Sequence, residues 1–478
     1  MNSVQAHGRG AGSILHRPYD LLLVVLLFIC SRAPLLNLGF GLDADAWRIA
    51  GSAFDIRNHL VYHTSRFPGY PVPEFINALV INHGWLATNC LTMLLSLFSV
   101  LVFTRIVEMH ELRHKLLTVA TYAFLPILWI NSTNTMDYMW SLCFIMLTWY
   151  ALLNDKALIA GLMMGMAVGS RLQTLILALP FIYLCYDHKD GLNKIIQFVL
   201  SMFASSILLY SPLLITYGLS FIRHYPSPSG LLQSGYLAVK HFGLPALIVL
   251  SVTICLSGGS LRNAITRKNK QIIFLILSVV LALIFFIVLP YHTEYIIPFL
   301  PFILLLVYQI GKRPLLILTS ILIISHAFVA IGSVKHLGNR KAQVRVFDVG
   351  TVITNYAARK QQLAIGRNFS TASINEHSVV IMGPWLPILA YLDENVSSVR
   401  TSKRMYDCNL PSAGVRDFQH DVSYRYLLTS DELEALLKEG FKVYYINGVR
   451  EYTIEVYGFD LAFCNTTYVP LEGKGINP

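Results

Sequence analysis

The sequence predicts a polytopic α-helical membrane protein with a soluble α/β domain at its C-terminal end. Of its 478 residues, 55% are hydrophobic and only 13% are charged, which is about half the charged share of a soluble globular domain. The mean hydropathy of +0.55 agrees with this class. The third observation is a change near residue 333, where long apolar runs give way to a polar segment.

The net charge of +10 does not indicate nucleic acid as a partner. In membrane proteins Lys and Arg gather on the cytoplasmic side, where they fix the orientation, and anionic lipid head groups bind the remainder. Residues 1–17 are polar and basic, and no small-residue cleavage site follows the first apolar run. We therefore expect a cytoplasmic N-terminus and a retained first span rather than a removed signal peptide.

Apolar runs of spanning length succeed one another along the chain. They cover residues 18–38, 84–106, 116–133, 138–153, 194–217, 243–257, 271–289, 296–310 and 314–332. A longer run, residues 157–186, carries Arg171 in its middle. Since a charge at the bilayer centre costs at least about 2.5–3.5 kcal/mol, we expect two short helices with Arg171 at the bend between them.

Loop charge predicts the orientation. If the 157–186 run crosses twice, the basic loops "SLRNAITRKNK" and "GKRP" both face the cytoplasm, as the positive-inside rule requires. This predicts about eleven crossings, an N-terminus inside and a C-terminus outside, in a membrane that we expect to be a bacterial inner membrane. The membrane domain would cover residues 18–334, with a long first outer loop over 39–83, and the soluble outer domain would cover residues 335–478.

The polar tail has the pattern of a small α/β layer. The segments "SVVIMG" and "FKVYYING" are typical of short buried strands. Between them, "TSDELEALLKEG" predicts a helix with Thr429 or Ser430 as its N-cap and Gly440 at its end. A strand, a helix and a strand joined by short turns predict an α/β layer, and the tail has no glycine-rich phosphate loop.

The cysteines do not form a metal or redox motif. Five of the seven lie in apolar runs, where cysteine is usually a small packing residue, and no C-x-x-C spacing occurs. Cys408 and Cys464 lie in the polar tail, on the side that we expect to be oxidising. We expect a disulfide between them, and two separate buried thiols are the alternative.

The first outer loop carries two acids in "GLDADAWRIAGSAF". Asp43 and Asp45 are candidates for a general base or a metal ligand at the membrane surface, and Arg48 is near enough to hold a carboxylate ionised. Acids two residues apart do not share a helical face, so both reach one cation only if the stretch is extended. A divalent cation, Mg²⁺ or Mn²⁺, at Asp45 therefore stays open. The alternative is two solvated or helix-capping acids.

The next segment, "YHTSRFPGYPVPEF", is expected to be a rigid turn because its three prolines block a regular helix. It carries His63, Arg66, Tyr70 and Glu74. Arginine is well suited to hold a phosphate by bidentate hydrogen bonds, so Arg66 is a candidate phosphate ligand. A structural turn that returns the chain to the second span is the alternative.

Two further polar places interrupt the spans. Arg171 and Gln173 lie in "GSRLQTL" at the expected bend, and His292 and Glu294 lie in the very short loop "YHTEY". Ionisable residues within or beside a span indicate a functional site by default, and bends of this kind line cavities. The alternative for the short loop is an interfacial tyrosine belt.

Taken together, these motifs resemble the GT-C superfamily of membrane glycosyltransferases, in particular enzymes of the protein O-mannosyltransferase or aminoarabinose-transferase type. "DADAW" is similar to the family's acidic first-loop motif, "GLMMGMAVGSR" to its broken span and "HTEYIIP" to its late loop. The resemblance covers roughly residues 18–335. In two places the chain departs from it: the second acid is Asp45 rather than an adjacent Glu, and the late loop lacks an arginine.

The resemblance implies an inverting transfer of a sugar from a polyprenyl-phosphate carrier to a hydroxyl of a glycan, lipid or protein. Asp43 would be the base, and Asp45 would assist it or hold the divalent cation. The leaving phosphate and the substrates would be bound by Arg66, Arg171, His292, Gln173, Glu294, Tyr70 and His63. A transporter or flippase for a lipid-linked sugar is the alternative, although such proteins usually carry paired broken helices and only one break is evident in the sequence.

Overall fold

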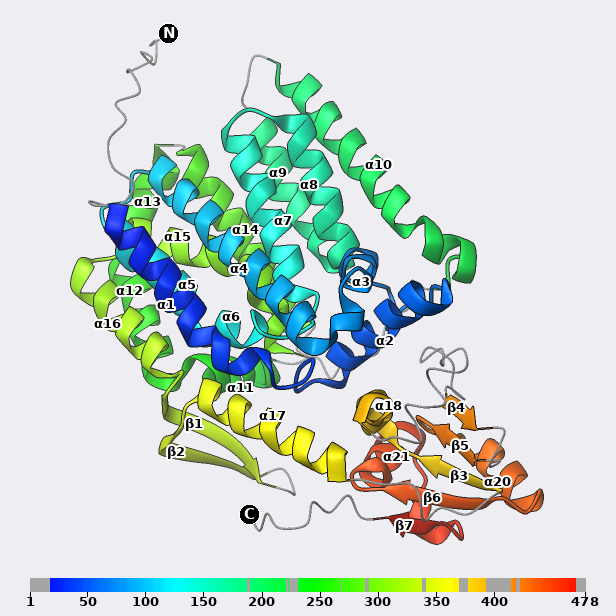
Figure 1. The fold of residues 1–478 in the computed structure, drawn as a ribbon. Helices are drawn as coiled ribbons and strands as arrows, with labels where there is room; N and C mark the ends of the chain where they lie inside the picture. The colour runs from blue at the N-terminus through cyan, green and yellow to red at the C-terminus, as the bar shows by residue number, and fades with distance from the viewer. Residues whose placement is uncertain are drawn as a thin grey trace.

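The computed structural model describes residues 18–186, 190–220, 222, 231–267, 269–288, 292–337, 341–368, 377–392, 414–417 and 422–469. Over these residues the chain forms a large helical part followed by a smaller sheet domain, which lies below α2 in Figure 1. Each part has its own hydrophobic core. One core runs through the helices, and the other is built mainly on strands β3, β5 and β6.

The helical part contains sixteen helices in the described ranges, joined by short 3₁₀ turns. The helices are α1 Pro18–Leu36, α2 Ala44–His59, α3 Pro71–Ala78, α4 Gly84–Met109, α5 Lys115–Phe124, α6 Pro126–Asn131, α7 Tyr138–Leu153, α8 Ala157–Ser170, α9 Ala178–Cys185, α10 Gly191–Tyr217, α11 Leu231–Phe242, α12 Leu244–Leu256, α13 Gly258–Thr266, α14 Lys270–Val288, α15 Leu300–Ile310 and α16 Arg313–Ser325; the 3₁₀ turns are η1 Ile81–His83, η2 Leu172–Leu177 and η3 Thr293–Phe299.

Several of these helices could span a membrane, which agrees with an integral membrane protein. Five segments of the described chain are long and apolar enough: Tyr19–Leu36, Ile81–Met109, Gly191–Tyr217, Lys270–Val288 and Thr293–Ile310. A sixth is possible if the bent pair α11 and α12 counts as one span, and four apolar helices are shorter. The count of about eleven crossings stays a prediction.

The break expected at Arg171 is confirmed. Helix α8 ends at Ser170, and Arg171 is extended, with φ −162° and ψ 107°. The chain continues as η2 and then α9. The charged side chain is therefore placed at a junction between two apolar helices rather than inside one.

A second break was missed by the sequence analysis, which expected a single span over residues 243–257. The structure has α11 before it, and α11 and α12 meet at a bend of 104°. Gly243 lies at the bend with φ +78°, a backbone conformation that glycine adopts without strain. The sequence analysis weighed against a transporter because only one break was evident, and the second break at Gly243 shows that this argument is wrong.

Three other boundaries differ from expectation, each because of proline placement or early helix termination. Residues 116–133 form two helices, since Pro126 starts α6. Pro71 begins α3 rather than preventing a helix, because the first turn needs no N–H from that residue. Finally, the apolar run 314–332 is helical only to Ser325, and strand β1 begins at Val329.

Helices α8 and α10 lie in close contact because glycines line the face of α8. A Cβ on Gly161 would lie 2.3 Å from the carbonyl oxygen of Phe198 in α10, and one on Gly165 would lie 2.9 Å from that of Met202. A Cβ on Gly169 would meet Val72 of α3 at 2.9 Å. Small residues at a spacing of four let helix backbones approach, so this stripe lets α8 lie directly against α10 and α3.

The C-terminal part confirms the predicted α/β layer. A hairpin of β1 Val329–Leu337 and β2 Lys341–Val349 leads into helix α17 Thr351–Asn368. The sheet has the order β4-β5-β3-β6-β7, with β4 antiparallel to β5 and the other neighbours parallel. Its elements are β3 Ser378–Ile381, η4 Gly383–Trp385, α18 Leu386–Leu392, β4 Gly414–Asp417, β5 Val422–Arg425, α20 Ser430–Lys438, β6 Lys442–Ile446, α21 Val449–Tyr457, η5 Leu461–Phe463 and β7 Thr467–Val469.

The predicted tail helix begins and ends as its sequence indicates. Thr429 is the N-cap of α20 and forms a capping box with Glu432. In this motif the side chain of each residue accepts a hydrogen bond from the backbone N–H of the other. Gly440 follows the helix with φ +88°. Cys464 is half-buried, whereas Cys408 lies outside the described residues, so the expected disulfide stays a prediction.

The close contact of α8 with α10 can be tested with a single methyl group. Gly161→Ala should lower the free energy of unfolding by about 1–3 kcal/mol, because the new Cβ overpacks against the backbone of α10. Gly235→Ala in α11 is the matched control, since a Cβ there has no atom within 4 Å, and it should be neutral or stabilising. The measurement is the thermal unfolding midpoint in detergent, and equal midpoints for the two variants would contradict the packing described.

Candidate active site

Asp43 is held at the start of α2 by its own backbone geometry. It is the N-cap, and its Oδ1 accepts a hydrogen bond from the N–H of Asp45 at 2.9 Å, the usual role of an N-cap aspartate. One turn further on, Trp47 is fully buried and its Nε1 donates to the carbonyl of Gly41 at 2.8 Å. The acid is thus fixed where the loop becomes a helix, and within the described chain no hydrogen bond is formed by Oδ2 of Asp43.

Asp45 lies between two arginines. Its Oδ1 is 3.0 Å from Nη1 of Arg48, one turn along α2, and its Oδ2 is 3.0 Å from Nε of Arg66 in the following turn. Both carboxylate oxygens therefore face a guanidinium group. This ties the turn that carries Arg66 to the first turn of α2.

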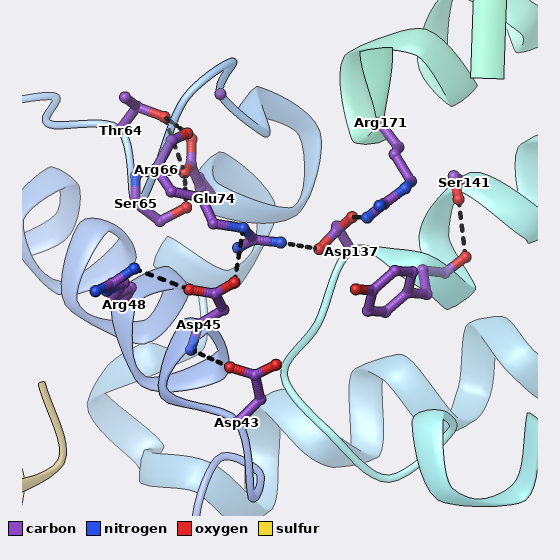
Figure 2. A network of polar contacts seen from close by, with 12 residues as sticks. Asp43, Asp45, Arg48, Thr64, Ser65, Arg66, Glu74, Asp137, Ser141 and Arg171 are labelled. Atoms are coloured by element: carbon purple, nitrogen blue, oxygen red, sulfur yellow. Dashed lines mark hydrogen bonds and ion pairs between the residues drawn. The ribbon is translucent and has the colours of Figure 1, made fainter. Parts of the chain in front are cut away.

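Arg66 continues to a third acid. Its Nη2 is 2.7 Å from Oδ1 of Asp137, whose side chain has no exposed surface, and Oδ2 of Asp137 is 2.5 Å from Nη1 of Arg171. Figure 2 shows Arg66 between Asp45 and Asp137, with Arg171 on the far side. We name this alternating series the acid–arginine row: it contains Arg48, Asp45, Arg66, Asp137 and Arg171.

Aromatic rings cover Arg66 and Arg171. The guanidinium carbon of Arg66 lies 3.9 Å from the centroid of the Tyr70 ring. That of Arg171 lies 4.3 Å from the Tyr138 ring and 4.4 Å from the Tyr295 ring. Cations over aromatic faces are stabilised, more so where water is excluded. The predicted site residue Tyr70 is therefore brought to the row, as a ring that supports Arg66.

Glu74 holds the turn rather than the row. Its Oε1 accepts from the N–H of Ser65 at 2.7 Å and from the Ser65 hydroxyl at 2.5 Å, and its Oε2 accepts from the Tyr62 hydroxyl at 2.6 Å. Figure 2 shows this cluster beside Arg66. Because Glu74 is fully buried and satisfied by its neighbours, it serves to fix the backbone just before Arg66.

The two first-loop acids differ in their titration. Desolvation by the surrounding atoms raises the pKa of Asp43, although its side chain is still exposed to solvent, and the charge of Asp45 raises that pKa further. The backbone N–H of Asp45, His292 and Arg66 offset part of the shift. Burial would also raise the pKa of Asp45, but Arg66 and Arg48 outweigh it and hold that pKa below its ordinary value. Paired acids with opposite shifts are typical of a site with one ionised anchor and one proton acceptor.

The pKa of Arg66 is shifted in the direction that keeps it charged. Burial alone would lower it, but Asp45, Tyr70 and Asp137 together raise it well above the ordinary value. Its Nη1 is buried and has no hydrogen-bond partner among the described residues. An arginine with one inward N–H group left over is a ready donor for an anionic oxygen.

The remaining predicted residues are placed around this centre. His292 is exposed and near enough to both first-loop acids for its charge to act on them. Gln173 follows Arg171 in η2, and its Oε1 is buried without a partner in the described chain. Glu294 lies near Tyr138 and His241, close enough for its charge to act on both side chains. His63 is tied to α2 through its carbonyl, which accepts from the Ser52 hydroxyl at 2.6 Å.

Asp137 is a candidate site residue that the sequence analysis missed. The signal was present: an acid in a very short loop between two apolar runs is a functional candidate by the same rule that selected His292 and Glu294. The structure gives it the central position, because it is the acid that joins Arg66 of the first loop to Arg171 at the break.

Arg359 of α17 was also missed, and it connects the tail to the site. It is fully buried, and all five of its N–H groups have acceptors. Nε donates to Leu38 O at 3.0 Å, and Nη2 donates to Gly39 O at 3.0 Å and Thr133 O at 3.2 Å. Nη1 donates to Thr133 Oγ1 at 3.2 Å and Asn134 Oδ1 at 2.9 Å.

The acceptors of Arg359 belong to the two segments that carry the acids. Leu38 and Gly39 precede Asp43, and Thr133 and Asn134 precede Asp137. One side chain of the tail domain thus clamps both acid-bearing loops. No sequence signal could have identified it, because a lone basic residue on a polar helix has no distinguishing spacing.

The residues present do not fit a divalent cation well. Among the described residues no group of three or more His, Cys, Asp or Glu is arranged to hold a metal ion. Asp45, the suggested ligand, has each oxygen 3.0 Å from an arginine nitrogen. A cation there would compete with two fixed positive charges.

No protein-family model matches the sequence, and no curated protein matches it. Among solved structures, the chain is similar to the crystal structure of the Archaeoglobus fulgidus oligosaccharyltransferase tethered with an acceptor peptide containing the NVT sequon, with 10% identity and a TM-score of 0.45. The match covers 79% of this chain and 63% of that chain. That enzyme belongs to the GT-C superfamily. At these values the likeness provides no residue correspondence, so the chemistry of the site rests on the contacts described above.

The clamp formed by Arg359 leads to a stability prediction. Arg359→Gln should lower the free energy of unfolding by about 2–4 kcal/mol, because several buried acceptors lose a charged donor. Lys360→Gln removes the same charge from the neighbouring, exposed position of α17 and should change stability by less than about 0.5 kcal/mol. Thermal or denaturant unfolding of the full chain measures both, and a neutral Arg359→Gln variant would show that the clamp contributes nothing.

Proposed function

We propose that this protein is an inverting membrane glycosyltransferase, which moves a sugar from a polyprenyl-phosphate carrier to a hydroxyl acceptor at the outer membrane–water interface. One observation supports this most. In the described chain, two polar atoms at the site have no hydrogen-bond partner: Oδ2 of Asp43, the N-cap of α2, and the buried Nη1 of Arg66 in the acid–arginine row. A proton acceptor beside an anion donor is the pair that this transfer needs.

Asp43 is the proposed base. It takes the proton of the acceptor hydroxyl while the oxygen attacks the anomeric carbon from the face opposite the carrier, and the configuration inverts. A useful base is ionised at working pH yet basic enough to accept a proton. The raised pKa of Asp43 moves it toward that compromise, whereas Asp45 stays ionised and fixes Arg66.

The arginines are the proposed ligands of the departing phosphate. As the glycosidic bond breaks, negative charge develops on the phosphate, and groups already aimed at it stabilise the transition state most. The row contains three arginines and two acids, so it carries one positive charge in excess. Arg66 donates through its remaining N–H group, Arg171 supports it across Asp137, and His292 is the exposed neighbour that meets the sugar phosphate.

The carrier and acceptor are proposed from the surroundings of the row. Arg171 ends α8, which packs along α10, and α10 exposes large apolar side chains such as Leu208 and Ile215. A polyprenyl chain on such a surface would be bound by buried apolar area. The amide oxygen Oε1 of Gln173 can accept a hydrogen bond but cannot donate one. We therefore assign it to a sugar hydroxyl, which can donate, rather than to a phosphate oxygen. The acceptor is a glycan, a lipid or a protein.

A transporter or flippase of a lipid-linked sugar remains the second candidate, because the described chain has breaks at Arg171 and at Gly243. In transporters, matched breaks meet at one substrate site. Here the break at Arg171 meets Asp137 and the tyrosines, whereas a Cβ on Gly243 at the other break would meet His326 and the carbonyl of Ile331. The two breaks have different surroundings, which favours the enzyme.

The proposed base is tested by Asp43→Asn. The variant keeps the size and the N-cap acceptor, so it should fold normally while turnover falls by a factor of about 10²–10⁴. The measurement is transfer from a polyprenyl-phosphate sugar by the purified full chain. Asp348→Asn in β2 is the control, which removes a carboxylate far from the row. If Asp43→Asn turns over normally and Asp45→Asn does not, the roles of the two acids are exchanged, and if both turn over normally there is no carboxylate base at this loop.

The pH profile gives an independent test of the same residue. A base works only when deprotonated, so the rate should fall as the pH drops through the pKa of Asp43. Because desolvation and Asp45 raise that pKa, this acid limb should lie above the pH expected for an ordinary aspartate. The residual activity of Asp43→Asn should lack the limb, and an unchanged limb in the variant would assign it to another group.

Metal removal tests the charge balance of the row. Since both oxygens of Asp45 are held by arginines, transfer should continue at an unchanged rate in EDTA. The control is a second sample to which excess Mg²⁺ or Mn²⁺ is restored after chelation. Activity that is lost in EDTA and recovered with either ion would show that a divalent cation takes part after all.

A further inference from the structure

A basic cavity lies at the opposite end of the helices from the acid–arginine row. It encloses about 660 Å³ and is lined by the loop before α5, the first turns of α5 and α16, and the start of α1. We name it the basic cavity. Its charged lining residues are Arg113, Lys115 and Arg313, with His114 beside them and Asp20 opposing them.

The position of the basic cavity follows from two helices that connect it to the site. Helix α1 begins at Pro18, beside Asp20 of the cavity, and ends at Leu36, whose carbonyl accepts from Asn89 in α4. Helix α4 runs from that contact to Met109, just before the cavity loop. Its 26 residues span about 39 Å, and both helices have the composition of membrane spans. The cavity and the row therefore face opposite sides of the membrane.

The charge of the cavity indicates an anionic ligand. Three cations face one carboxylate, which leaves two positive charges before His114 is counted. In the described residues, no hydrogen bond or ion pair is formed by the side chains of Arg113, Lys115 or Arg313. Among the described residues, no acid is therefore paired with these three charges.

Backbone groups add to this positive field. Helices α5 and α16 both start at the cavity, at Lys115 and Arg313, and neither has a side-chain N-cap hydrogen bond. The N-terminal N–H groups of a helix carry partial positive charge and bind anions readily. Two uncapped helix starts and three basic side chains therefore point to one anion.

The walls of the cavity indicate what carries that anion. Half of the lining is apolar, including Leu116 in α5 and Ile317 in α16, and both of these side chains are substantially exposed. A free phosphate would gain nothing from contact with these apolar side chains, whereas an acyl chain would bury their apolar surface. Basic pockets between membrane helices on the cytoplasmic side are suited to phospholipid head groups.

We propose that the basic cavity binds the phosphate of an anionic membrane lipid, with its acyl chain against the apolar wall. The site is separate from the acid–arginine row and does not depend on the function proposed for it. Arg113 in the loop before α5 and Arg313 at the start of α16 hold the phosphate oxygens, and the first turns of α5 and α16 complete the anion site. Binding joins α1, α5 and α16 at that membrane face.

The experiment uses the purified full chain and native mass spectrometry in detergent, with phosphatidylglycerol or phosphatidylcholine added in turn. We expect phosphatidylglycerol to be retained preferentially. The double variant Arg113→Gln/Arg313→Gln should weaken its binding by roughly twenty-five-fold, the product of two lost charges worth about a factor of five each. Arg262→Gln/Arg267→Gln is the matched control, since it removes two exposed basic residues near α13 that do not line the cavity, and it should bind like wild type.

Further arms keep the proposal falsifiable if the double variant folds poorly. Asp20→Asn removes the one acid of the lining and should tighten binding, and Arg113→Lys/Arg313→Lys keeps the charge and should retain most of it. Equal retention of the two lipids, or an equal loss in the α13 control, would overturn the proposal. Inorganic phosphate that displaces phosphatidylglycerol and raises the unfolding temperature as much as the lipid does would assign the cavity to free phosphate instead.

Discussion

The structure depends on a buried carboxylate, Asp137, that is shared by two arginines from distant parts of the chain. Arg66 comes from the turn after α2, and Arg171 from the break after α8. A charge in such surroundings is costly unless paired, and removal of one partner leaves the others uncompensated. Asp137 therefore requires that the first loop, the loop before α7 and the broken helix come to the same point. The site is formed by this requirement as much as by the packing of the helices.

Two packing features lie next to the segments that carry Asp137 and its partners: the glycine face of α8 and the buried side chain of Arg359. On one side, the glycine face of α8 lets α10 approach closely along the helix that ends just before Arg171. On the other side, Arg359 holds the segments before Asp43 and Asp137 through five hydrogen bonds. Neither the glycine face nor Arg359 belongs to the acid–arginine row itself.

Sequence patterns predicted the parts of this site that have local causes. The break at Arg171 followed from the cost of a charge in an apolar run, and the tail helix α20 followed from Thr429 and Gly440. The pairing of Asp45 with Arg66 and the clamp of Arg359 join residues far apart in sequence, and no spacing rule contains that information. Asp137 was within reach of the rule for acids between apolar runs. The bend at Gly243 was missed because α11, with Lys240 and His241 in its last turn, is less apolar than the segment that follows it.

The hydrogen bonds of Arg359 also bear on how separable the two parts of the chain are. The tail has its own sheet and its own core, so by composition it is an autonomous module. Yet its helix α17 supplies the donors that the loops at residues 38–39 and 133–134 use, and Gln362 adds a bond to the carbonyl of Leu42 at 2.9 Å. The loops that carry Asp43 and Asp137 are thus completed by donors from the tail. A chimaera that exchanges tails between related chains would have to carry these loop segments along with α17. The helical part and the tail would therefore have to change together for this site to be kept.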